Sequence, residues 1–284
     1  MFRILSKRVL TPSITLMEVD APRLAAAAQP GQFLIVRARE QGERIPLTIC
    51  DYDGKKGTVT ICTQAIGAST RLINSLHEGE CFTDFVGPLG QPSEFVAWSD
   101  ERLRGTRFLF IAGGLGAAPV YPQVKYLHEK GACIDVIAGA KTADLIILEK
   151  ELCSICDNLY VCTDDGSYGE KGMVTGVIAR LLADGRQYDQ AVAIGPMVMM
   201  KFTTLALKES GIPLTVSLNT LMVDGTGMCG ACRVTVGGKT RFACVDGPEF
   251  NAYEVDFDEA MRRQGMYRDL ELEKDHQCKI GRDA

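Results

Sequence analysis

The chain has 284 residues, of which 46% are hydrophobic and 24% are charged, and its formal net charge is −5 at pH 7. This size accommodates two or three small domains. No basic stretch favours nucleic acid and no run of 18 apolar residues favours a membrane span, so neither is an expected partner.

Eleven cysteines bear on the cellular compartment. Residues 1–20 alternate polar and apolar side chains and lack the continuous apolar stretch of a signal peptide. Many cysteines without such a signal indicate a reducing environment, where thiols bind metal or stay free. We therefore expect a cytoplasmic protein. Cys153 and Cys156 have redox-motif spacing but lack a second pair, so we expect two unpaired thiols at the end of a helix.

Residues 1–100 are predicted to be an antiparallel β domain. Short β-rich segments alternate with turn signals such as Pro30-Gly31 and Asp53-Gly54. A single helix is predicted at 69–76. The predicted strands are 2–9, 13–20, 32–38, 44–51, 57–63 and 80–86. Six strands at this spacing indicate a barrel or sandwich, and a β-barrel is our assignment.

Residues 101–215 change to alternating strands and helices. The predicted strands are 107–112, 134–138, 159–162, 191–194 and 214–218. The predicted helices are 117–130, 144–152, 174–182 and 197–209. Such alternation is typical of a parallel sheet with helices on both faces.

Residues 216–284 are predicted to form a small third lobe that holds a metal cluster. Asp224 is followed by Cys229, Cys232 and then Cys244, which is the C-x4-C-x2-C…C spacing of a plant-type [2Fe–2S] site with aspartate in the first place. Glycines within the loop let its backbone curl around a cluster. A hairpin of strands 233–236 and 240–244 is predicted to carry Cys244 back toward the loop.

Three alternatives to this cluster remain open at the level of sequence. The cysteines could bind structural zinc, which accepts aspartate with thiolates. They could be free buried thiols. Asp224 could be a neighbour of a real cluster whose fourth ligand is Cys278 or a residue of a partner. We favour a [2Fe–2S] cluster held by Asp224, Cys229, Cys232 and Cys244, which indicates a protein that transfers electrons.

Two motifs of the β domain are suited to a phosphorylated, aromatic cofactor. The segment Arg44-Ile-Pro-Leu-Thr48 offers a cation, a proline and a hydroxyl that can clasp a phosphate and flank a flavin ring. The segment Gly67-Ala-Ser-Thr70 opens the predicted helix and presents free N–H groups and hydroxyls to an anion. An ordinary helix cap is the alternative explanation of the second motif.

Three motifs of the α/β domain follow strands. Gly113–Pro119 links a strand to a helix, where glycines let a pyrophosphate approach the helix N-terminus. Gly195-Pro196-Met197 begins a later helix. Asp164 and Asp165 can accept ribose hydroxyls and would repel a 2′-phosphate. Each could equally be a turn with no ligand.

In this order the motifs R-x-P-x-T, G-x-S/T, G-G-x-G-x-A-P and G-P-x-x-M resemble the ferredoxin–NADP reductase superfamily. With the cysteine loop added, the chain is similar to the electron-transfer subunit of dihydroorotate dehydrogenase B. It is closer to the small subunit of the electron-bifurcating NADH-dependent ferredoxin:NADP oxidoreductase and to related sulfide dehydrogenase subunits. The dihydroorotate type has cysteine in the first cluster place, whereas this chain has Asp224, as the bifurcating subunits do.

The resemblance implies FAD in the barrel, NAD(H) on the α/β domain, one [2Fe–2S] cluster in the lobe, and a larger flavin and iron–sulfur partner subunit. It implies an oxidoreductase that needs no catalytic side chain. The residues expected at FAD are Arg44, Pro46, Leu47, Thr48, Thr63, Gly67, Ser69 and Thr70. Those expected at the nicotinamide dinucleotide are Gly114, Gly116, Pro119, Asp164, Asp165, Gly195, Pro196 and Met197.

The chain departs from the superfamily pattern at two positions. Ile194 stands where many members have cysteine before the Gly-Pro pair, and Lys141 stands where an arginine is usual. The partner also stays open, because a dihydroorotate dehydrogenase, a sulfide dehydrogenase or a hydrogenase would use the same cofactors. A nucleotide-binding module with a zinc knuckle is the non-enzymatic alternative.

Overall fold

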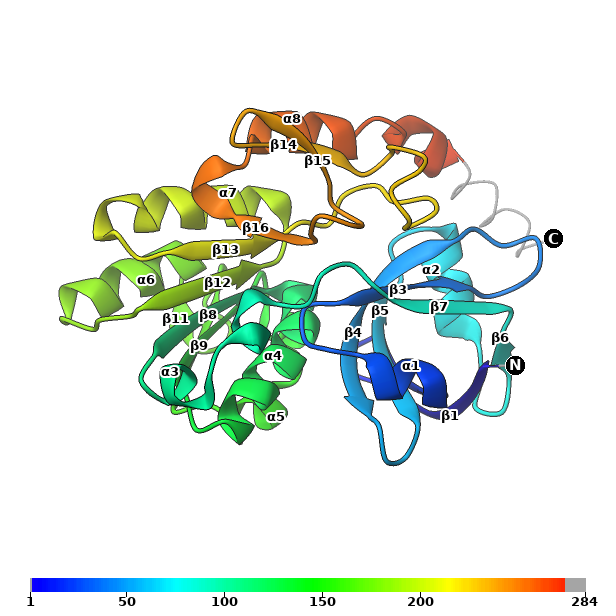
Figure 1. The fold of residues 1–284 in the computed structure, drawn as a ribbon, viewed down its shortest axis with the longest axis horizontal. Coiled ribbons are helices and arrows are strands. Elements are labelled where there is room, and N and C mark those ends of the chain that lie inside the picture. Colours follow the sequence, from blue (N-terminus) through cyan, green and yellow to red (C-terminus); the bar gives the residue numbers. More distant parts are fainter. Residues whose placement is uncertain (1, 274–284) are drawn as a thin grey trace.

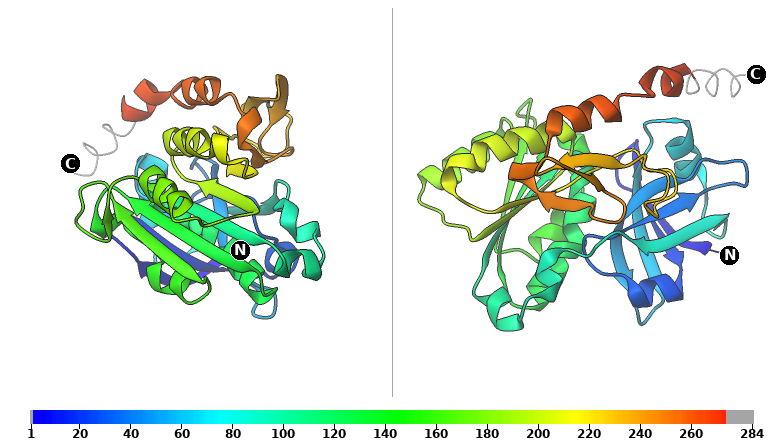
Figure 2. Two further views of the ribbon diagram at one scale, coloured as in Figure 1. Left: turned by 90° about the vertical axis from the view of Figure 1, so that its left-hand side faces the viewer. Right: turned by 45° about the horizontal axis from the view of Figure 1, so that its top comes forward.

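The computed structural model describes residues 2–273 and contains two large sheets side by side, with a smaller lobe lying across both (Figures 1 and 2). The first sheet is antiparallel and has the strand order β6-β1-β2-β5-β4-β3-β7. Its strands are β1 (Phe2–Val9), β2 (Ile14–Asp20), β3 (Phe33–Arg37), β4 (Ile45–Asp53), β5 (Thr58–Gln64), β6 (Cys81–Phe82) and β7 (Asp84–Leu89). The predicted barrel is confirmed, because these strands curl around one buried apolar cluster.

The prediction of a single helix in this part of the chain was wrong. Besides α2 (Ala68–Ser75), the structure contains α1 (Pro22–Ala27). Pro22 occupies the first turn of α1, where its missing N–H costs nothing, and Leu24 packs into the barrel. Six residues are too few to show helical periodicity in a sequence, which is why the pattern missed this helix.

The second sheet has the order β11-β10-β9-β8-β12-β13-β16. Its strands are β8 (Arg107–Gly113), β9 (Cys133–Ala140), β10 (Asn158–Thr163), β11 (Glu170–Lys171), β12 (Gln190–Ile194), β13 (Leu214–Ser217) and β16 (Glu249–Asn251). All neighbours are parallel except β16, which is antiparallel to β13. Side chains of β8 alternate between two buried clusters, one on each face, as expected for a central strand.

Helices cover both faces of this sheet, as predicted (Figure 1). One face carries α4 (Ala117–Glu129) and α5 (Glu149–Cys153), and the other carries α6 (Val174–Ala183) and α7 (Met197–Leu207). The short helix α3 (Asp100–Arg104) precedes β8. The continuous helix predicted over 144–152 was wrong, because Leu148 adopts a left-handed conformation that separates a 3-10 turn from α5.

The barrel and the parallel sheet meet through α4, which lies against β4. Lys125 of α4 donates to Asp51 of β4, with the ammonium nitrogen 2.8 Å from Oδ1. Within the described residues no helix is both long enough and apolar enough to cross a bilayer.

The C-terminal lobe contains the hairpin of β14 (Arg233–Val236) and β15 (Lys239–Phe242), followed by α8 (Phe257–Gln264). The hairpin was predicted, but Cys244 does not lie on its second strand. Lys239–Phe242 ends two residues earlier, and Cys244 occupies the turn that follows. The lobe also supplies β16 to the edge of the parallel sheet. The domain boundaries proposed at 100/101 and 215/216 stay predictions.

Candidate cofactor and cluster site

A crevice is expected where the direction of strand order reverses, between β8 and β12. The chain leaves β8 toward α4 and leaves β12 toward α7, on opposite faces of the sheet. The carboxyl ends of both strands are in close contact, since a Cβ on Gly195 would lie 3.0 Å from the Cα of Gly113. Two predicted nucleotide motifs are therefore adjacent in the fold.

The three candidates of the first motif have different surroundings. Gly114 has a positive φ of 54°, and no atom lies within 4 Å of the position its Cβ would occupy, so it faces open space. Gly116 is buried, and its Cβ would lie 2.0 Å from the carbonyl oxygen of Ile194. Pro119 is buried in the first turn of α4. Gly114 is thus placed to meet a ligand, whereas Gly116 allows the start of α4 to lie close against β12, and Pro119 is enclosed by the protein.

The second motif also divides. Pro196 is the exposed cap of α7, whereas Met197 is 3% exposed and packs into the core. Met199 instead lies over the crevice, because a Cβ on Gly113 would come within 2.3 Å of its sulfur. Sequence reasoning missed Met199. No sequence signal separates it from Met197 and Met200, the other methionines at the start of α7.

Asp164 and Asp165 lie in the loop between β10 and β11 and are both exposed. Asp165 accepts hydrogen bonds from the backbone N–H and the hydroxyl of Ser167, at 2.9 and 2.7 Å. These bonds lower its pKa, the hydroxyl having the largest effect. Within the described residues the carboxylate of Asp164 accepts no hydrogen bond. Asp165 therefore stabilises its own turn, and Asp164 is the acceptor available to a ligand.

In the barrel, Pro46 and Thr48 lie on one face of β4, because alternate residues of a strand share a face. Leu47 points the other way and packs against the barrel core. Arg44 precedes the strand and lies 3.6 Å from Asp84. Pro46 and Thr48 are half-buried, so this face of β4 is open to a ligand.

The N-terminus of α2 also has room for a ligand. No atom lies within 4 Å of a Cβ built on Gly67, the N-cap residue. Thr70 accepts from the backbone N–H groups of Ile66 and Gly67, both at 3.0 Å, and Ser69 donates to Glu43. The hydroxyl of Thr63 is buried without a hydrogen-bond partner in the described residues. A buried orphan hydroxyl is costly, and a ligand group beside it would offset that cost.

The cluster loop brings two of the predicted ligands together. The sulfur atoms of Cys232 and Cys244 are 3.1 Å apart, and both residues are 1% exposed. Burial raises the pKa of Cys244 to about 12. Cys229 is exposed in the same loop. Cys278 lies outside the described residues.

Asp224 is held by its own loop. Its carboxylate accepts from the backbone N–H of Thr226 at 2.6 Å and from that of Cys229 at 3.2 Å. These bonds, the first above all, lower its pKa. Across residues 2–273 no three His, Cys, Asp or Glu side chains converge on one point that could hold a single metal ion. A [2Fe–2S] cluster makes a different demand, because its four ligands are shared between two irons.

The cluster loop rests directly on the barrel (Figure 2). A Cβ on Gly225, whose φ is 78°, would lie 2.7 Å from Ile35 of β3 and 2.9 Å from Leu89 of β7. Ile35 is the cross-strand partner of Pro46. Because paired residues project to the same side of a sheet, the flavin motif and the cluster loop occupy the same side of the barrel.

Comparison with known proteins places the chain in a family. A sequence model described as the iron-sulfur cluster binding domain of dihydroorotate dehydrogenase B matches residues 219–256. An electron transfer subunit homolog of dihydroorotate dehydrogenase B (NAD(+)) from Thermotoga maritima is 46% identical over 253 residues, or 89% of this chain and 86% of that protein. The electron transfer subunit from Geobacillus thermodenitrificans is 32% identical over 258 residues, or 89% and 96%. The chain belongs to the family of dihydroorotate dehydrogenase B electron-transfer subunits.

A solved structure of an NADH-dependent reduced ferredoxin-NADP oxidoreductase, described in terms of flavin-based electron bifurcation, is also similar to this family member. Its matched chain is 41% identical with a TM-score of 0.87, and the match covers 96% of this chain and 97% of that one. The predicted fold class and the prediction of an oxidoreductase subunit are confirmed. The predicted set of FAD, NAD(H) and an iron–sulfur cluster agrees with this membership. The individual residues assigned to each cofactor stay predictions.

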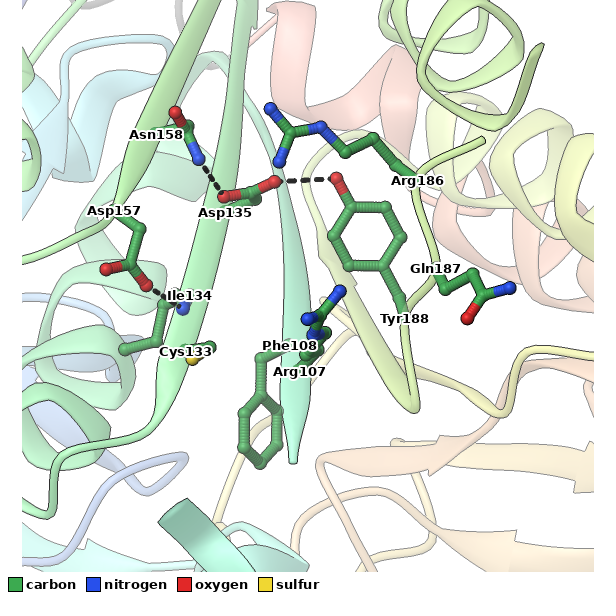
Figure 3. Close-up of a pocket in the computed structure, with 10 residues that line it drawn as sticks. All are labelled: Arg107, Phe108, Cys133, Ile134, Asp135, Asp157, Asn158, Arg186, Gln187 and Tyr188. Carbon is green, nitrogen blue, oxygen red and sulfur yellow. Dashed lines mark hydrogen bonds between the residues drawn. The ribbon is translucent and has the colours of Figure 1, made fainter. Parts of the chain in front are cut away.

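A separate pocket of about 210 Å³ lies at the opposite, amino-terminal edge of the parallel sheet (Figure 3). The carboxylate of Asp135 lines the pocket and accepts hydrogen bonds from the hydroxyl of Tyr188 and the side-chain amide of Asn158, both at 2.7 Å. Arg107 and Arg186 also line it. In this electron-transfer subunit the carboxyl ends of the strands carry every predicted nucleotide motif, so the pocket is not part of that site.

Proposed function

We propose that this chain is the flavin and iron–sulfur subunit of an electron-bifurcating, NADH-dependent ferredoxin:NADP oxidoreductase. The observation that supports this most is the 41% identity and TM-score of 0.87 over 96% of the chain to a structure described in those terms. Asp224 in the first cluster place agrees with it, since the resemblance links aspartate there to the bifurcating subunits.

In this proposal each cofactor has a defined cradle. Pro46 and Thr48 flank FAD on the open face of β4, Arg44 meets its phosphates, and the start of α2 receives its pyrophosphate. Gly114, Pro196 and Asp164 receive NAD(H) at the crevice. When bound, FAD takes two electrons from NADH as hydride and passes single electrons onward. The protein's part is to hold the nicotinamide against the flavin face and to exclude water.

Asp224, Cys229, Cys232 and Cys244 are the proposed cluster ligands. The donor set fits, because two thiols already touch and a third thiol lies in the same loop with an ionised carboxylate. The loop's glycines at 225, 227 and 230 have positive φ, which permits the close curl that a cluster needs.

Replacing Asp224 by alanine should lower cluster retention at least about tenfold, since even second-shell changes weaken metal binding by this order. Iron content and the electron paramagnetic resonance signal of the reduced protein measure the effect. Asp224→Cys should restore the iron with an altered signal. Glu254→Ala, which removes an exposed carboxylate from the same lobe, is the matched control. Full iron content and an unchanged resonance signal in Asp224→Ala would exclude Asp224 as a cluster ligand.

NADH should be preferred over NADPH because a 2′-phosphate beside Asp164 is repelled. Replacing Asp164 by asparagine should raise kcat/KM for NADPH at least tenfold relative to NADH, equivalent to about 1.4 kcal/mol. Steady-state flavin reduction with each nucleotide measures this ratio. Glu209→Gln, an exposed carboxylate at the other edge of the sheet, should leave it unchanged. Equal use of both nucleotides by the unmodified protein would refute the preference.

The partner in this proposal is a larger flavin and iron–sulfur subunit that docks over the cluster loop in the cytoplasm. Val223, next to Asp224, is 52% exposed, and Met228, next to Cys229, is 88% exposed. Exposed apolar side chains around a redox loop suit a protein contact that brings electron carriers close.

Affinity purification of the native complex without oxygen tests the proposal. The expected result is a heterodimer with a flavin absorbance band, iron, and NADH-dependent reduction linked to NADP and ferredoxin. A co-purifying subunit that oxidises dihydroorotate would instead favour the second candidate function, electron transfer to a dihydroorotate dehydrogenase, which the family membership supports. A colourless or zinc-containing protein would eliminate both.

A further inference from the structure

Glu249 is a half-buried residue whose carboxyl group lies at the junction of all three parts of the molecule. It belongs to β16, the strand that the C-terminal lobe adds to the parallel sheet. Its Oε1 accepts from the hydroxyl of Ser93 at 3.1 Å and from the side-chain amide of Gln123 at 2.8 Å. Ser93 follows the barrel, and Gln123 lies on α4. One oxygen atom thus connects the lobe, the segment after the barrel and the nucleotide-domain helix.

The surrounding backbone is packed tightly enough to make this junction specific. A Cβ on Gly31, at the entry to β3, would lie 3.0 Å from the carboxylate of Glu249 and 2.4 Å from the hydroxyl of Ser93. Gln91 donates its backbone N–H to Gly247 at 2.7 Å and its side-chain amide to Val245 at 2.9 Å. Residues 90–93 are therefore held between the barrel and the cluster lobe.

The ionised form of Glu249 is disfavoured where it lies. Burial raises its pKa to about 7, against a smaller opposing effect of the bonds from Ser93 and Gln123. Its neighbours Gly31, Ser93, Gln123 and Ser217, the last its cross-strand partner, are not ionisable. No ionisable group in the described residues shifts this pKa.

Gln123 also has an unused hydrogen-bond acceptor at this junction. The side chain is fully buried, and its Oε1 has no hydrogen-bond partner in the described part of the chain. A protonated Glu249 can donate one hydrogen bond, whereas an ionised one can only accept. Protonated Glu249 can therefore offer a donor to Oε1 of Gln123, whereas ionised Glu249 leaves that oxygen without a partner.

We infer that Glu249 is a latch that closes the cluster lobe onto the segment after β7 and onto α4 when its carboxyl is protonated, and loosens when that carboxyl is ionised. The sign follows from linkage. A carboxyl that binds its proton more tightly in the closed state stabilises that state when protonated, and this contribution is lost as the pH rises through neutrality. If the chain has the proposed electron-transfer role, the latch regulates how closely the lobe is held to the flavin barrel.

Hydrogen exchange on the purified full-length protein tests the latch. Glu249→Gln keeps the shape and stays neutral at every pH. At pH 4.0, below the ordinary pKa of 4.5 for a glutamate carboxyl, the variant and the unmodified protein should exchange at equal rates in segments 90–97, 117–129 and 245–252. At pH 8.5 the unmodified protein should exchange at least threefold faster in those segments. Comparing the two proteins at one pH removes the chemical pH dependence of exchange.

Two further variants keep the test decisive. Glu254→Gln, an exposed carboxyl in the same lobe, should behave as the unmodified protein at both pH values. Ser93→Ala removes a bond that favours the ionised form, so loosening should begin at a higher pH. Equal exchange of Glu249→Gln and the unmodified protein at pH 8.5 overturns the latch. The latch is also overturned if Glu254→Gln slows exchange at pH 8.5 as much as Glu249→Gln does. If the purified protein contained neither iron nor flavin, the proposed function would be refuted. The hydrogen-exchange comparison would still test the latch.

Discussion

Replacing Cys244 by alanine should abolish cluster assembly, which is the largest effect expected from a single substitution in this chain. Cys244 is buried against Cys232, with 3.1 Å between the sulfur atoms. Alanine offers no ligand there, and the next residue, Val245, is apolar. Iron and acid-labile sulfide should fall to background, and NADH should still bleach the flavin while reduction of any acceptor beyond the cluster stops.

Cys62→Ala provides the matched control for this experiment. Cys62 is also a buried thiol, but it lies in β5 of the barrel. Its replacement should leave iron content unchanged. Cys244→Ala with full iron would exclude Cys244 as a ligand, and zinc in place of iron in the unmodified protein would favour the structural-metal alternative.

Replacing Gly116 by alanine should have the second largest effect, on stability and nucleotide binding together. The added Cβ would lie 2.0 Å from the carbonyl oxygen and 2.7 Å from the carbonyl carbon of Ile194, both backbone atoms of a central strand. Gly116 has a φ of −59°, so alanine is not disfavoured by dihedral strain and the cost is steric. Overpacking of this kind costs about 1–3 kcal/mol of folding free energy.

The same clash should displace the start of α4, where Gly114 faces the proposed nucleotide site. We expect the dissociation constant for NADH to rise at least about tenfold, measured by titration alongside chemical unfolding. Gly176→Ala is the control, because Gly176 lies within α6, is not among the glycines with positive φ, and has open space around its Cβ. Unchanged stability and affinity in Gly116→Ala would show that α4 is not fixed by this contact.

Much of this architecture could be predicted because its signals are local. Strand β1 was predicted with its observed bounds, and alternation of strands and helices predicted the parallel sheet and its two helical layers. The spacing of Asp224, Cys229 and Cys232 needs no tertiary information. Agreement is good wherever sequence period and packing favour the same answer.

The errors concern features that only packing determines. Leu148 breaks a helix through one left-handed residue, which no periodicity reveals. Which side of a motif faces a ligand is also set by packing: the side chain of Met197, which stays a predicted nucleotide contact, is buried in the core. Asp165, likewise still a predicted contact, accepts hydrogen bonds from Ser167 of its own turn. The sequence did not single out Glu249, because its contacts with Ser93 and Gln123 join residues that are distant along the chain.

The strand β16 has a consequence for how such a protein can evolve. The segment that carries the cluster also completes the nucleotide sheet, pairing with β13 along its outer border. Removing everything after residue 217 would strip that border from β13 and expose unpaired backbone groups, a surface prone to self-association. The iron–sulfur lobe is consequently not an independent module. Gene fusion or shuffling would have to move the nucleotide sheet and the cluster loop together.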